Sequence, residues 1–172
     1  MTMSEKKIVI CGGGVIGASV AYHLTLKGAE DVTVVERYEV ACASSGKAGG
    51  FLSLDLNDKT PTGSLSRLSF EMHKDLAETL KPFGEVDYRP LKAYNVETTP
   101  ENAAAAGAAG AGLGLRRPGD IPEWLNSRRV AMAQELAHEK QAAQVNPYKL
   151  CNAMMDAAKS REPILPAPTL PS

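Results

Sequence analysis

Residues 7–36 read KIVICGGGVIGASVAYHLTLKGAEDVTVVE, and this stretch decides the fold of the chain. Its opening run, Lys7–Cys11, is rich in β-branched side chains, which is typical of a parallel strand buried on both faces. Val15–Lys27 carries apolar side chains at helical spacing, and Val32–Val35 forms a second apolar run. The order strand, glycine turn, helix and strand within about 30 residues predicts a βαβ unit.

The glycines that follow the first strand match the pattern GxGxxG at Gly12, Gly14 and Gly17. Gly12 can take the tight turn, Gly14 lets the backbone approach a pyrophosphate, and Gly17 lets the helix pack closely on the sheet. Val15 and Ile16 stand at the helix start, where unpaired N–H groups and the positive end of the helix dipole favour an anion. The pattern predicts a diphosphate site.

Glu36 lies at the end of the second strand, 19 residues after Gly17. A carboxylate there can accept a hydrogen bond from a ribose 2′-hydroxyl, and its charge disfavours the 2′-phosphate of NADP. The alternative is that the glycines only form a turn and that Glu36 is a solvated strand end. Agreement of the turn, the helix and the acid favours a bound adenine dinucleotide.

Three segments, IVICGGGVIGASVAYHL, VTVVER and ASSGKAGGFL, resemble the amino end of the D-amino-acid-oxidase-like (DAO) family of FAD-dependent oxidoreductases, which includes relatives of glycine and sarcosine oxidase. RLSFEMHKDLAETL, DYRPLKAYNVE and AQVNPYKLCNAM resemble the order of the family's later elements. The resemblance covers most of residues 7–160. It implies an α/β fold, with a Rossmann-like FAD-binding βαβ unit followed by the start of an α+β substrate domain.

The resemblance also implies FAD and not NAD as the cofactor, because in this family the loop after the ribose-binding acid lies along the flavin. The residues of that loop are Ser44, Ser45, Gly46, Lys47, Ala48, Gly49 and Gly50. Small residues allow main-chain amides to reach the cofactor. A mobile surface loop with one solvated lysine is the alternative. Arg37 also fits the family, although a solvated arginine explains it equally well.

The chemistry implied by the resemblance is oxidation of the C–N bond of a small amine or amino acid, with hydride transfer to FAD. No general base is nominated, so the catalytic residues stay unknown. One rival function is that of an NAD-linked dehydrogenase, which shares the glycine fingerprint. Another is a non-catalytic form that binds a protein partner through exposed apolar surface.

The rest of the chain predicts further elements. Helical spacing predicts a helix over Leu65–Leu80, and Val86–Glu97 is expected to form a strand with Pro90 at an edge or bulge. Residues 131–141 are expected to form a short helix. A final helix is expected to start at an Asn146 cap followed by Pro147.

We expect a dinucleotide-binding part over residues 1–85 and part of a substrate domain over 86–161. Residues 103–114 hold 7 Ala, 4 Gly and 1 Leu and are expected to be a flexible insertion, whereas 162–172 is expected to be a disordered proline-rich tail. Full members of the family resemble chains of roughly twice this length, at about 100–200 residues per domain. The chain is therefore expected to be a truncated form with little activity alone.

Composition excludes several other classes of protein. With 19 Lys+Arg against 20 Asp+Glu, the 172-residue chain has no basic excess for nucleic acid. The chain has three cysteines, Cys11, Cys42 and Cys151, an odd number without C-x-x-C spacing, which indicates neither a disulfide framework nor a zinc site. The histidines have no second ligand at a suitable spacing, so no metal site is expected. No apolar run approaches the ~20 residues of a membrane span. With no room for a leader, a cytoplasmic protein is expected.

Overall fold

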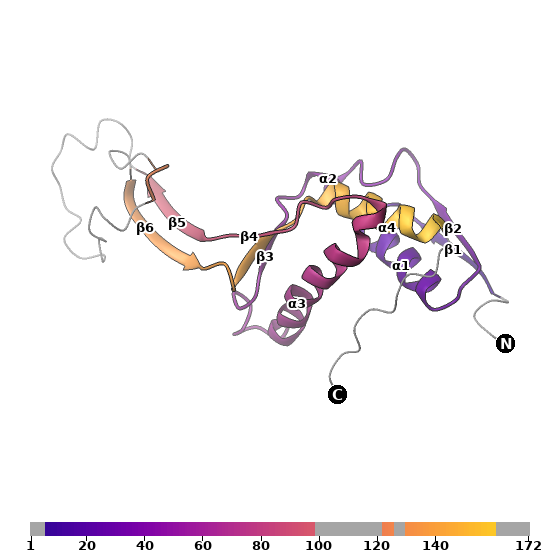
Figure 1. The fold of residues 1–172 in the computed structure, drawn as a ribbon, viewed down its shortest axis with the longest axis horizontal. Coiled ribbons are helices and arrows are strands. Elements are labelled where there is room, and N and C mark those ends of the chain that lie inside the picture. The colour runs from indigo at the N-terminus through magenta and orange to yellow at the C-terminus, as the bar shows by residue number, and fades with distance from the viewer. Residues whose placement is uncertain (1–5, 99–121, 126–129, 161–172) are drawn as a thin grey trace. The chain divides into compact units, whose positions relative to one another are not determined.

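The computed structural model describes residues 6–98, 122–125 and 130–160 (Figure 1). The chain divides into two compact units. The first unit comprises Met1–Pro90 and Ala143–Ser172, and the second comprises Leu91–Ala142. The predicted insertion at 103–114 and the predicted tail at 162–172 lie outside the described residues. The assignment of a cofactor part and a substrate part to residues 1–85 and 86–161 stays a prediction.

The predicted βαβ unit is confirmed in the first unit. Strand β1 (Lys7–Cys11), helix α1 (Val15–Leu26) and strand β2 (Asp31–Val35) follow in order (Figure 1). The two strands pair in parallel, from Lys7 with Asp31 to Cys11 with Val35. Gly28 has φ +81° just after α1, so it supplies the left-handed residue that commonly ends a helix.

Side chains alternate along both strands, so the β1–β2 sheet has two distinct faces. Ile8, Ile10, Val32 and Val34 are half-buried on one face, where α1 lies. On the opposite face, the side chains of Val9 and Val35 are 57% and 55% exposed. Within the described residues, therefore, this sheet is covered on one face only, whereas the apolar run predicted burial on both.

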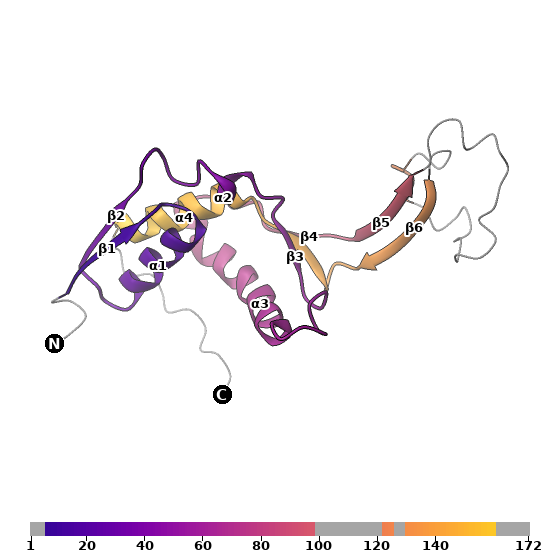
Figure 2. The same ribbon diagram turned by 180° about the vertical axis from the view of Figure 1, so that it is seen from behind.

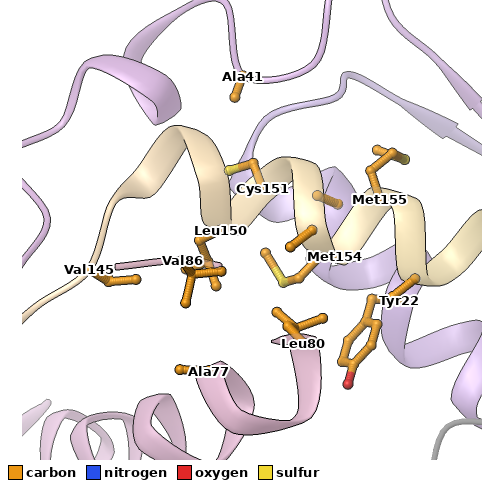
Figure 3. Packing of buried hydrophobic residues seen from close by; sticks show 13 residues of the cluster. Tyr22, Ala41, Ala77, Leu80, Val86, Val145, Leu150, Cys151, Met154 and Met155 are labelled. Carbon is orange, nitrogen blue, oxygen red and sulfur yellow. The ribbon is translucent and has the colours of Figure 1, made fainter. Parts of the chain in front are cut away.

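The core of the first unit forms around helix α4 (Pro147–Ser160), which packs along α1 as both ribbon views show (Figures 1 and 2). Met154 of α4 lies against Leu80, the last residue of α3 (Gly63–Leu80), with Tyr22 of α1 nearby (Figure 3). The predicted cap of α4 is confirmed, because Asn146 Oδ1 accepts the Lys149 N–H at 3.2 Å. The helix predicted over Leu65–Leu80 is confirmed as α3.

A three-stranded sheet of order β3-β7-β4 lies beside this core. It is built from β3 (Phe51–Ser53), β7 (Ala142–Gln144) and β4 (Arg89–Pro90). β4 is an edge strand, antiparallel to β7, with Arg89 opposite Gln144. Of the edge or bulge expected for Pro90, the strand order shows the edge, where proline has no N–H to donate to a further strand.

The single strand predicted over Val86–Glu97 is wrong in its extent. Asp87 has φ +55°, a left-handed conformation that interrupts extended backbone, and its carboxylate pairs with Lys149 Nζ at 2.8 Å. The Lys149 ammonium holds the pKa of Asp87 below its ordinary value. Regular pairing therefore begins only at Arg89 and resumes in β5 (Ala93–Thr98) of the second unit.

The short helix predicted over 131–141 is also wrong. β6 (Val130–Ala137) is a strand that pairs antiparallel with β5 in the second unit. Its Ala, Gln, Glu and Leu residues are good helix formers, but pairing and packing between strands override local propensity. The loop 42–52 contains one helical turn, α2 (Ser44–Lys47). None of the helices in the described ranges is both long and apolar enough to cross a membrane.

Candidate cofactor site

The glycine turn joins the end of β1 to the start of α1. Gly12 has φ +99°, and its N–H donates to Val35 O at 2.8 Å, which ties the turn to the end of β2. A Cβ added to Gly17 would lie 1.9 Å from Gly12 O, far inside van der Waals contact. The turn and the first turn of α1 can therefore approach this closely only with glycine at position 17.

The amino end of α1 has backbone donors that the helix itself cannot satisfy. Gly14 is the N-cap residue, with extended φ and ψ and no side chain to cap the helix, and its carbonyl accepts the Ala18 N–H at 2.9 Å. The N–H groups of the following residues, Val15, Ile16 and Gly17, lie before the first intrahelical donor. They stand at the positive end of the helix dipole, the arrangement that binds anions.

The Glu36 carboxylate lies at this turn. Its Oε2 accepts the Gly13 N–H at 2.6 Å, and its Oε1 accepts the Tyr38 N–H at 3.0 Å. The hydrogen bond from Gly13, followed by that from Tyr38, holds the pKa of Glu36 below its ordinary value. The side chain is therefore an ionised acceptor at neutral pH, and the structure brings it to the glycines from 23 residues away.

The loop after β2 is fastened to the same turn. Ser45 Oγ accepts the Val15 N–H at 3.0 Å, and the Ala41 N–H donates to Gly13 O at 3.1 Å. Ala41 has φ +59°, and a Cβ on Gly46 would lie 2.0 Å from Ala41 O, so the α2 turn packs directly on the backbone before it. The loop is thus held against the amino end of α1.

Not every predicted site residue lies at this cluster. Arg37 stacks its guanidinium on the Tyr38 ring, 5.3 Å from the centroid, at an exposed position. Ser44, Lys47, Ala48 and Gly49 are exposed along the loop, and Gly50 ends it with φ +70°. The residues brought together at the turn are the following: Gly12, Gly14, Val15, Gly17, Glu36 and Ser45.

Sequence reasoning missed Gly13, whose N–H and O both take part in the cluster. Its position inside GxGxxG could have indicated a role for its backbone. It also missed Gln144, which donates from Nε2 to Gly49 O at 3.2 Å across 95 residues of sequence. No local pattern marks a contact at that separation.

A cavity of about 370 Å³ opens beside Glu36, between α1, β2 and α4. Val32, Val34 and Met155 contribute apolar surface to it, and Lys159 contributes an amine. Within the described ranges, no group of three or more His, Cys, Asp or Glu side chains is arranged to hold a metal ion.

Comparison with known proteins places these features in a family. The family model for FAD dependent oxidoreductases, DAO, matches residues 7–162. A protein of Schizosaccharomyces pombe that is named as an oxidoreductase is 31% identical over 163 residues, which are 90% of this chain and 39% of that protein.

Two solved structures share the fold. Glycine oxidase from Bacillus cereus matches with a TM-score of 0.68 at 22% identity, over 91% of this chain and 44% of that one. Fructosamine oxidase from Aspergillus fumigatus matches with a TM-score of 0.63 at 19% identity, over 94% of this chain and 39% of that one.

The chain spans about two fifths of the length of these three proteins. Within that span, the family model extends over almost the whole described region, including the glycine turn, Glu36 and the loop 44–50. The protein therefore belongs to the DAO family of FAD-dependent oxidoreductases.

Proposed function

We propose that this chain binds FAD through the glycine turn, Glu36 and the loop 44–50, and that it serves a flavin-dependent oxidation of a small amine or amino acid. The observation that carries the proposal is the 2.6 Å hydrogen bond from Gly13 N–H to Glu36 Oε2. It joins a diphosphate-binding turn and a ribose-binding carboxylate in one cluster, as adenine dinucleotides require.

The residues present fit such a ligand. The first turn of α1 offers main-chain donors and the positive end of the helix dipole to a diphosphate. Gly14 has no side chain, and a Cβ there would already lie 3.0 Å from Ser45 Oγ, so the approach to these donors is narrow. Glu36, with its lowered pKa, offers an ionised carboxylate to ribose hydroxyls.

FAD, when bound, supplies the acceptor for a hydride from the substrate C–N bond. In this proposal, the Ile16 and Gly17 amides at the start of α1 bind the diphosphate, because Ser45 Oγ already accepts the Val15 N–H, and Glu36 orients the adenosine. The loop 44–50 supports the flavin side, and no described residue is assigned as a general base. Fold likeness to proteins named glycine oxidase and fructosamine oxidase supports a small amine or amino acid as substrate.

Stability measurements with different nucleotides test the proposal. FAD at a hundred times its Kd is expected to stabilise the folded chain by about 2.7 kcal/mol, because it binds only the folded state. For a chain of this size that is a rise in Tm of about 5–10 °C. NADP at equal concentration is expected to have no effect, because Glu36 repels its 2′-phosphate. A shift with NAD and none with FAD would favour an NAD-linked dehydrogenase instead.

We also propose that the chain by itself binds FAD weakly, turns over little and associates with another polypeptide of its family. The exposed sheet face supports this, since Val9 and Val35 are more than half exposed and parallel sheets are normally covered on both faces. Co-purification of the chain with a full-length family member is the expected result. The Val35→Glu substitution should abolish it, whereas Leu136→Glu in the second unit should not. A monodisperse monomer in mixtures of the two proteins would contradict the association.

A further inference from the structure

Gln144, the last residue of β7, bridges two distant parts of the first unit. Its Nε2 donates to Gly49 O at 3.2 Å, and its Oε1 accepts a hydrogen bond from Arg89 Nη2 of β4. Arg89 is directly opposite Gln144 in the antiparallel pair, so the sheet itself sets the distance between these two side chains. The amide thus connects the edge strand β4 to the backbone of the loop 44–50.

The orientation of the Gln144 amide follows from the chemistry of its neighbours. A guanidinium has donors only, so Arg89 can bond to the amide oxygen but not to its nitrogen. The nitrogen is therefore directed toward the Gly49 carbonyl, which can only accept. Among side chains of this length, only glutamine accepts a hydrogen bond on one side and donates a hydrogen bond on the other.

Gly50 is held by the neighbouring backbone. Its carbonyl accepts the Val145 N–H at 3.0 Å, and a Cβ on it would lie 1.9 Å from Val145 O. Gly49, in contrast, has no atom within 4 Å of an added Cβ. Two consecutive glycines would leave the peptide unit between them free to rotate, so the hydrogen bond from Gln144 decides its orientation.

The orientation of this peptide unit matters for ligand binding. The unit is planar and trans, so its C=O and N–H point to opposite sides. With the Gly49 carbonyl directed at Gln144, the Gly50 N–H is directed to the side away from β7. The bridge therefore determines which face of the loop presents a main-chain donor.

We propose that Gln144, oriented by Arg89, is a positioning residue that fixes the Gly49–Gly50 peptide so that the Gly50 N–H donates to the flavin of bound FAD. This inference rests on the proposed function. Gln144 is half-buried and lines a cleft of about 390 Å³ instead of the core, so a side chain of similar length can replace it without disturbing the packing.

Titration of the 172-residue chain with FAD and with ADP tests this role. ADP can contact the glycine turn and Glu36 but has no flavin for the loop to bind. The Gln144→Met substitution removes both hydrogen bonds at nearly constant length and is expected to raise the Kd for FAD about threefold to tenfold. The Kd for ADP should stay unchanged. Gln144→Glu, which still accepts from Arg89 but cannot donate to Gly49, should raise the FAD Kd at least as much.

The matched control is Gln134→Met, at an exposed position of β6 in the second unit, which should change neither Kd. Bound flavin in the two Gln144 variants should also show a shifted visible absorption band, which a merely structural residue would not cause. Equal rises in the Kd for FAD and ADP would overturn the positioning role. An unchanged Kd for FAD in Gln144→Met would also overturn the positioning role, but it would leave the proposed function intact. Failure of the unsubstituted chain to bind either nucleotide would overturn the proposed function itself.

Discussion

The Gly17→Ala variant is expected to lose FAD binding and about 3 kcal/mol of unfolding free energy. The new Cβ would lie 1.9 Å from Gly12 O and 3.1 Å from Gly12 C, and both of these atoms are backbone. Neither can rotate away as a side chain would, so the turn between β1 and α1 must open. Overpacking of this kind costs about 1–3 kcal/mol and sometimes more. Urea unfolding and an FAD titration of the same sample measure the two effects.

Gly28→Ala is the matched control for this loss. Gly28 has φ +81°, but an added Cβ there meets no atom within 4 Å, and the residue lies outside the candidate site. We expect it to cost about 1–2 kcal/mol through the left-handed backbone alone and to leave the Kd for FAD unchanged. Normal FAD uptake by Gly17→Ala would show that the close contact with Gly12 does not shape the proposed diphosphate site.

The Glu36→Ala variant is expected to raise the Kd for FAD about tenfold to a hundredfold. It removes the ionised acceptor proposed for the ribose, and it removes the acceptor for the Gly13 and Tyr38 N–H groups. Hydrogen bonds to a charged group are stronger than those between neutral groups, which accounts for a rise of this size. Glu36→Gln keeps an acceptor without the charge and should show a smaller rise. Fluorescence titration with FAD measures both.

The pH dependence of FAD binding provides the control for Glu36. The pKa of this carboxyl lies below its ordinary value of about 4.3, so the ionised form persists into mildly acidic solution. Binding to the unsubstituted chain should therefore be constant from neutral pH to about pH 5 and weaken as pH falls through the lowered pKa. Glu36→Ala should lack this acid limb. An identical acid limb in both proteins would assign it to another group.

Much of the βαβ unit and its glycine turn was predictable because the signals that predict them are local. The apolar run of β1 and the GxGxxG spacing each concern residues that are close neighbours in the chain. The same holds for the Asn146 cap of α4, where the side chain bonds to a backbone group only three residues ahead. Such signals can be recognised without knowledge of the rest of the fold.

The predictions from sequence that are wrong concern segments whose structure depends on residues far away in the chain. β6 has the composition of a helix, but its partner is β5, more than 30 residues earlier in the chain. The strand predicted from Val86 was interrupted by the left-handed Asp87, whose carboxylate pairs with Lys149 across 62 residues. For β6, pairing with β5 and packing between the strands override the weak local preference for helix.

The sequence by itself determined the βαβ unit, its glycine turn and the presence of an acid at the end of β2. The physical reason is that hydrophobic patterning, turn chemistry and helix capping act over a few residues. Only the tertiary structure decided that Ser45 bonds to Val15 and that Gln144 bonds to Gly49. Those contacts depend on how α2, α4 and the β3-β7-β4 sheet pack on one another. That packing is set by the burial of side chains from every element at once, which no single segment encodes.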